Sequence, residues 1–131
     1  MKKQYIFFSL LIAIGVIAIS SFKSVNKSAP ANCMMAVTYS EMAMIQFKKA
    51  YKAKTIEAAQ PFIKKGMEQV QQASAYAVQC DCTQSESNAL TAYGFGKKAL
   101  DATELEKMKP EAKKAMDLSI TAMAAAQRCD K

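Results

Sequence analysis

Four cysteines are the residues of this sequence best suited to covalent chemistry. They are Cys33, Cys80, Cys82 and Cys129. An even number of cysteines in a short chain is typical of a disulfide framework in an exported protein. A four-thiolate zinc site and a redox-active Cys-x-Cys pair with a lowered thiol pKa are the alternatives. The single residue between Cys80 and Cys82 is too short a spacing for a usual zinc knuckle, so disulfides are favoured.

Methionines beside the first cysteine suggest a second kind of chemistry. Cys33, Met34, Met35 and Met42 together offer soft sulfur donors, which suit Cu(I). The alternative function is therefore a soft-metal carrier for copper or zinc, or a thiol redox protein. The favoured interpretation has no metal and no cofactor, because methionine commonly fills gaps in an apolar core. The methionines expected to do so are Met35, Met44, Met67, Met116 and Met123.

Lysine pairs form the most distinctive polar pattern. They are the candidate anion-binding residues Lys48, Lys49, Lys64, Lys65, Lys97, Lys98, Lys113 and Lys114. An array of lysines can dock on anionic headgroups or polyanions. From residue 32 onward, however, 14 Lys and Arg face 11 Asp and Glu, a net charge of only about +3. The sequence therefore gives no specific signal for a nucleic-acid partner.

Signals for catalysis are weak. The chain has no histidine, which is the commonest general base and nitrogen metal ligand. It also lacks a Gly-rich phosphate loop, a Gly-x-Ser-x-Gly elbow and paired Glu-x-x-His motifs. We therefore expect a non-enzymatic protein.

The chain from Cys33 onward contains one stretch twice. Residues 33–81 align without gaps on residues 82–130 after a shift of 49 positions, with 16 identities. The identities include both cysteines of each copy, the proline and two lysine pairs. We interpret the two copies as a tandem duplication, so both should fold alike.

Each copy shows two segments with helical spacing of apolar residues. The expected helices cover residues 33–53, 61–80, 83–100 and 110–129, and no strand is expected in residues 32–131. Asn32 is expected to cap the first helix, and Thr83–Glu86 and Thr103–Glu106 fit capping boxes. Pro61 and Pro110 suit the first positions of the second and fourth helices.

The helices predict an all-α fold in which two helix hairpins form an up-and-down four-helix bundle over residues 32–131. The core is rich in alanine, and Gly94 and Gly96 are expected where helices approach closely. All four cysteines should then gather at one end of the bundle, with the lysine pairs toward the other. Cys33–Cys80 maps onto Cys82–Cys129 under the 49-residue shift, and this predicted pairing closes each hairpin at its open end: Cys33–Cys80 with Cys82–Cys129. Cys33–Cys82 with Cys80–Cys129, and Cys80–Cys82 with Cys33–Cys129, are the other two pairings.

The N-terminal residues have a different composition. A basic start is followed by an apolar run from Tyr5 to Ile19, which is typical of a secretory signal peptide over residues 1–21. Such a run spans about 22 Å as a helix, less than the roughly 30 Å hydrocarbon core of a bilayer. An uncleaved membrane anchor is the alternative, cleavage is expected after Ser20 or Ala31, and residues 22–31 are expected to be a linker.

The sequence thus predicts an exported, periplasmic or extracellular binding module at the cell envelope. Its partner is expected to be an anionic surface or an envelope protein. Membrane contact is expected only through the N-terminal segment, if that segment is not cleaved.

Overall fold

A computed structural model describes residues 32–129 of the chain. Four α-helices account for nearly all of them: α2 (Met34–Lys52), α3 (Ile56–Gln79), α4 (Thr83–Asp101) and α5 (Leu105–Cys129). These residues contain no strand, as expected for an all-α fold. The expected signal peptide and linker lie outside the described residues. None of the four helices combines the length and the apolarity needed to cross a membrane.

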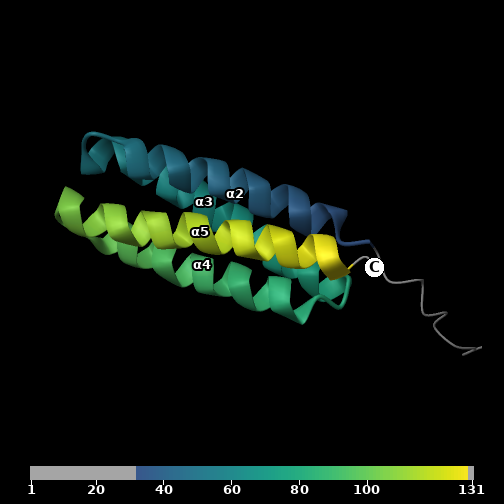
Figure 1. Ribbon diagram of the computed structural model, residues 1–131. Coiled ribbons are helices and arrows are strands. Elements are labelled where there is room, and N and C mark those ends of the chain that lie inside the picture. The colour runs from purple at the N-terminus through teal and green to yellow at the C-terminus, as the bar shows by residue number, and fades with distance from the viewer. Residues whose placement is uncertain (1–31, 130–131) are drawn as a thin grey trace, which may run out of the picture.

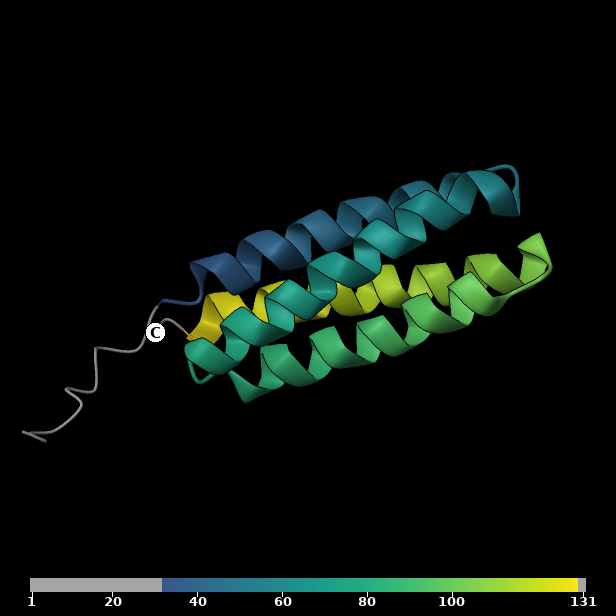
Figure 2. The same ribbon diagram turned by 180° about the vertical axis from the view of Figure 1, so that it is seen from behind.

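The helices pack side by side as an antiparallel bundle (Figures 1 and 2). Each helix lies against its two neighbours, α2 against α3 and α5 and α4 against α3 and α5, while diagonal contacts are few. We call α2 with α3 hairpin 1, and α4 with α5 hairpin 2. The helix bounds follow the repeat, because α4 begins and ends at the positions equivalent to the ends of α2, and α5 begins at the position equivalent to the start of α3.

Helices α3 and α5 begin five residues earlier than the prolines predict. Thr55 precedes α3, and its hydroxyl accepts a hydrogen bond from the Ala58 amide at 3.1 Å. The side-chain cap starts the helix at Ile56, so Pro61 is its sixth residue. The equivalent Pro110 is the sixth residue of α5. The prediction that prolines occupy the first helical position was therefore wrong, because capping upstream determines the start.

The caps of α2 and α4 both differ from expectation. The residue before α2 is Cys33, which makes no side-chain cap bond, although the Asn32 side chain accepts a hydrogen bond from the Met34 amide at 3.3 Å. The residue before α4 is Cys82, and it also makes no side-chain cap bond. Thr83 is already helical, so the predicted Thr83–Glu86 capping box is wrong.

The two hairpins meet at a sharp turn around Asp81. Asp81 has a φ of 55°, the left-handed conformation that ends many helices. The Cys82 amide donates to the Ala77 carbonyl at 2.8 Å, and the Asp81 amide donates to the Val78 carbonyl at 3.2 Å. This pair of bonds is the Schellman motif, and it explains why a single residue suffices between two cysteines.

The core consists mainly of alanine, with one large ring at its centre. Phe47 from α2 is fully buried, and a Cβ added at Gly66 of α3 would lie 2.8 Å from its Cε1 atom. A Cβ added at Gly96 of α4 would lie 3.1 Å from the same atom. Gly96 is thus a point of close approach, as predicted. Gly94 is exposed, with nothing within 4 Å of an added Cβ, so the prediction was wrong there.

Candidate functional site

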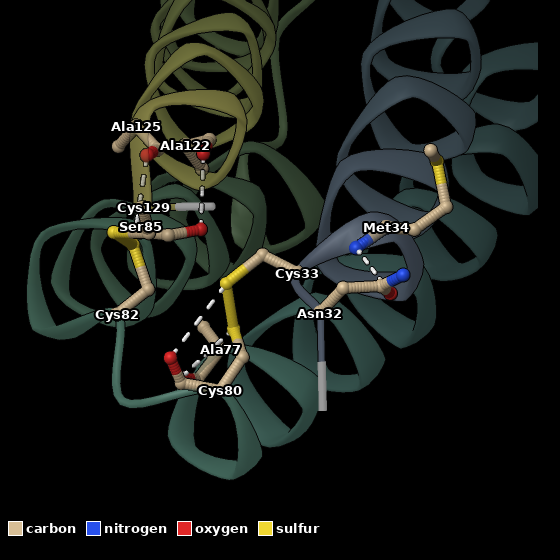
Figure 3. Close-up of a disulfide and its surroundings, with 10 residues drawn as sticks. All are labelled: Asn32, Cys33, Met34, Ala77, Cys80, Cys82, Ser85, Ala122, Ala125 and Cys129. Atoms are coloured by element: carbon tan, nitrogen blue, oxygen red, sulfur yellow. Dashed lines mark hydrogen bonds between the residues drawn. A yellow bond between two sulfur atoms is a disulfide. The ribbon is translucent and has the colours of Figure 1, made fainter. Parts of the chain in front are cut away.

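All four cysteines lie at one end of the bundle and are paired (Figure 3). Disulfides join Cys33 to Cys80 and Cys82 to Cys129, the pairing that the repeat predicts. Each bond ties the residue just before the first helix of a hairpin to the end of its second helix. Among the described residues no cysteine is free. Disulfides persist in oxidising compartments, so the two bonds indicate a location outside the cytoplasm.

The disulfides change what the sulfur cluster can do. Cys33 is buried and bonded to Cys80, so its sulfur is not a thiolate beside the methionines. Met34, Met35 and Met42 are exposed by 58, 41 and 41%. Within residues 32–129, no three His, Cys, Asp or Glu side chains gather closely enough to hold a metal ion. A soft-metal site here would have to be built from the three methionines alone.

Met35 also corrects the predicted core. It was expected to fill a gap beside the buried stripe of α2, but it faces solvent. Met67 is buried as expected, and Met44, Met116 and Met123 are partly buried. The fully buried methionine is Met108, which lies between the expected third and fourth helices. The early start of α5 brings Met108 into the helix and turns it toward the core.

The eight predicted anion-binding lysines are all exposed, in the half of the bundle away from the cysteines. Lys48 and Lys49 lie near the end of α2, and Lys97 and Lys98 lie near the end of α4. The remaining pairs lie in the third turns of α3 and α5. We call residues 48–68 the lysine end of hairpin 1 and residues 97–117 the lysine end of hairpin 2.

In hairpin 2, several lysines form ion pairs with acidic side chains or lie over an aromatic ring. Lys113 donates to Asp117 at 2.7 Å, and this hydrogen bond together with the Asp117 charge raises the pKa of Lys113. Lys114 pairs with Glu111 at 3.4 Å, and its Nζ atom lies 5.2 Å from the Phe95 ring centroid.

The turn and α4 complete this pattern. Lys107 pairs with Glu104 at 2.9 Å. The Lys98 Nζ atom lies 5.0 Å from the centroid of the same Phe95 ring that Lys114 approaches. Four of the six lysines at this end therefore have a counter-charge or a ring close by, which reduces what they can offer to an external anion.

In hairpin 1 the lysines have fewer intramolecular partners. The Lys49 Nζ atom lies 5.7 Å from the Phe62 ring centroid. Across the described chain, no ion pair within 4.0 Å involves a lysine of hairpin 1. Their ammonium groups are therefore available to an outside partner.

The difference between the hairpins is plain in the two aligned segments. Each lysine end has six lysines, but that of hairpin 1 has two acidic residues and that of hairpin 2 has five. Their net charges are therefore +4 and +1. The repeat alignment emphasises the lysines that match and hides the acids that do not. A comparison of the charges at aligned positions of the two copies would have revealed this contrast from the sequence.

Comparisons with models of protein families, with curated proteins and with solved structures found no match to this chain.

Proposed function

We propose that this protein is an exported, non-enzymatic binding module whose hairpin 1 docks on an anionic partner at the cell envelope. The observation that carries the proposal is the contrast between the lysine ends: equal numbers of lysines, but a net charge of +4 on hairpin 1 and +1 on hairpin 2. Several ammonium groups on one exposed surface attract arrays of anionic groups over a range of about a Debye length.

Two further features of the chain support this proposal. The apolar run of residues 5–19 has the form of a signal peptide, and the two disulfides suit an oxidising compartment outside the cytoplasm. The bundle is a stapled, compact scaffold, so its exposed residues are free to specialise in binding. Its lack of histidine leaves few groups that titrate near neutral pH for catalysis.

The proposal includes an origin for the scaffold by tandem duplication of one hairpin. Matching helix bounds, matching disulfides and a buried-residue pattern that recurs in the second copy all support it. The two hairpins differ in that hairpin 2 has the acids Asp101 and Glu111 where hairpin 1 has Lys52 and Phe62. In this account the lysine end of hairpin 1 is the active surface, and that of hairpin 2 is a nearly neutral copy.

Charge reversal in each hairpin tests the function. We expect the full chain to bind immobilised polyphosphate and phosphatidylglycerol vesicles at low salt, and to release as salt rises. The variant Lys48→Glu/Lys49→Glu/Lys64→Glu/Lys65→Glu should lose at least tenfold in binding, since it removes the excess positive charge.

The matched control is Lys97→Glu/Lys98→Glu/Lys113→Glu/Lys114→Glu, which makes the same change in net charge on hairpin 2. It should weaken binding several-fold less than the hairpin 1 variant. Equal losses from both variants would mean that only total charge matters, and unchanged binding in both would refute the proposed function. Circular dichroism checks that each variant keeps its helices.

A further inference from the structure

The outward face of α2 carries apolar side chains where a helix of a bundle normally carries polar ones. Met34, Met35, Met42 and Ile45 are exposed by 58, 41, 41 and 40%. Of the eight large hydrophobic residues exposed in residues 32–129, five lie on α2, so the helix concentrates such residues. Met35, Met42 and Ile45 follow one another at intervals of seven and three positions, which places them along one side of the helix.

The same face ends in positive charge. Lys48, Lys49 and Lys52 are exposed in the last two turns of α2, and they continue the line of the methionines and Ile45. Helix α2 runs from the cysteine end of the bundle to the opposite turn (Figure 1). Its outward side is therefore largely apolar near the cysteines, where Thr38 and Glu41 are also exposed, and basic near that turn. Glu41 is the one acidic residue of α2.

Helix α4 shows that the scaffold does not require this arrangement. It has the same length and the same place in its hairpin, and the positions equivalent to the four apolar residues are Thr83, Gln84, Thr91 and Gly94. All four are exposed. Helix α4 exposes one large hydrophobic residue, Leu90, where α2 exposes five. The concentration of such residues therefore distinguishes hairpin 1, the hairpin whose lysine end also has the larger positive charge.

We propose that the outward face of α2 lies against an anionic lipid bilayer, with its apolar side chains in the interfacial region and its lysines on the phosphates. This inference rests on the proposed function and names its partner. A helix that lies in the plane of a membrane combines buried apolar side chains with basic residues that reach anionic headgroups. Methionine and isoleucine enter the acyl boundary without a shaped pocket, and lysine stems extend upward to the phosphates.

Charge complementarity favours a bilayer over a second copy of the chain. Two α2 helices packed in parallel would bring Lys48, Lys49 and Lys52 against their own equivalents, and like charges repel. Packed antiparallel, the basic end of each would cover the apolar end of the other with charge. A membrane surface satisfies both ends at once, since it presents a hydrocarbon boundary and anionic phosphates along the whole helix.

The position of α2 in the chain supports the same partner. The apolar run of residues 5–19 precedes α2, and only residues 20–33 separate the two. An extended chain of that length spans at most about 50 Å. If the run is retained in a bilayer, the chain therefore enters α2 at its apolar end and within reach of the same membrane.

A single tryptophan tests the inference locally, because the chain has none. The variants are Ile45→Trp on α2 and Gly94→Trp at the equivalent position on α4, both exposed. With phosphatidylglycerol vesicles, the fluorescence of the Ile45→Trp protein should shift to shorter wavelength and be quenched by at least half when the lipids carry bromine on their acyl chains. The Gly94→Trp protein should change little. Both proteins keep the same N-terminus, so its contribution is common to the two.

A second variant transfers the polar residues of α4 to α2. The quadruple variant Met34→Thr/Met35→Gln/Met42→Thr/Ile45→Ala should still bind vesicles at low salt. At about 0.15 M salt, its affinity for the vesicles should be roughly tenfold or more below that of the unaltered protein. Binding to immobilised polyphosphate should not change.

The outcomes separate the inference from the proposed function. Polyphosphate binding without vesicle binding, or vesicle binding in which the Ile45→Trp protein is unquenched or quenched no more than the Gly94→Trp protein, overturns the membrane inference and leaves the anion-binding function standing. Failure of the unaltered chain to bind either probe overturns both.

Discussion

Hairpins 1 and 2 share one scaffold but differ in the centre of the core and on the surface. At the centre, Phe47 of hairpin 1 faces Gly96 of hairpin 2, its own equivalent in the repeat. On the surface, hairpin 1 keeps a net charge of +4 at its lysine end, while hairpin 2 balances its lysines with acids. Two hairpins that differ in sequence can thus divide roles that two identical hairpins cannot: hairpin 1 supplies the core ring, and Gly96 of hairpin 2 supplies part of the space for it.

The disulfides are where the hairpins should differ least, and their removal has the largest expected effect. Both bonds join residues 47 positions apart. In the chain-entropy model each bond stabilises the fold by about 4 kcal/mol, because it closes a loop of the same length and so lowers the conformational entropy of the unfolded chain by the same amount. We therefore expect Cys33→Ala/Cys80→Ala and Cys82→Ala/Cys129→Ala to lower the free energy of unfolding by similar amounts. Urea unfolding followed by circular dichroism measures both.

A clear difference in stability between the two variants would contradict the expectation that the two disulfides contribute equally. Cys33, Cys80 and Cys82 are buried while Cys129 is exposed, so packing differs even though loop length does not. If hairpin 1 loses more than twice as much stability as hairpin 2, local packing rather than loop closure controls the contribution of the bonds.

Exchanging the central residues should have the next largest effect. Phe47→Gly/Gly96→Phe moves the ring to the other hairpin, where Ala115 carries a Cβ at the position equivalent to Gly66. We expect a loss of about 3 kcal/mol from overpacking and a vacated site. Adding Gly66→Ala/Ala115→Gly moves the space along with the ring and should recover at least half of the loss. No recovery in thermal or urea unfolding would show that the two sides of the core are not interchangeable.

The smallest effect is expected at two glycines in similar helices but different surroundings. Gly94→Ala should raise the free energy of unfolding by up to about 1 kcal/mol, because alanine favours the helix and nothing lies within 4 Å of the added Cβ. Gly66→Ala should instead destabilise, since its Cβ would come within 2.8 Å of the Phe47 ring. Melting temperatures that move in the same direction for both variants would contradict the packing described around Phe47.

The sequence predicts the bundle and its disulfides well, because both follow from spacing. Apolar residues at helical intervals define four amphipathic segments. In the pairing Cys33–Cys80 with Cys82–Cys129, the 49-residue shift of the repeat maps one bond onto the other, and each bond closes one hairpin. The helix starts are harder to predict. A proline indicates a helix start nearby, but the Thr55 hydroxyl caps α3 six residues before Pro61. The start of the helix is therefore determined by local hydrogen bonds that the proline does not reveal.

Surface features of the site were predicted only in part. The eight paired lysines are exposed, while anion binding by them stays a prediction. The exposure of Met35 on α2 was not predicted, because a hydrophobic residue beside a row of buried residues is easily assigned to the core. The ion pairs that Glu111 and Asp117 make with lysines were not predicted, since a lysine's partners depend on rotamers and on neighbouring turns as well as on sequence spacing.

The central claim is that hairpin 1, and not its copy, faces the anionic partner. Lysine footprinting on the unaltered protein tests it most directly: acetylation of each lysine is quantified by mass spectrometry with and without phosphatidylglycerol vesicles at low salt. We predict at least threefold protection of Lys48, Lys49 and Lys52, with Lys97 and Lys98 acetylated as in the free protein. Equal protection in both hairpins, or protection confined to hairpin 2, would contradict the account.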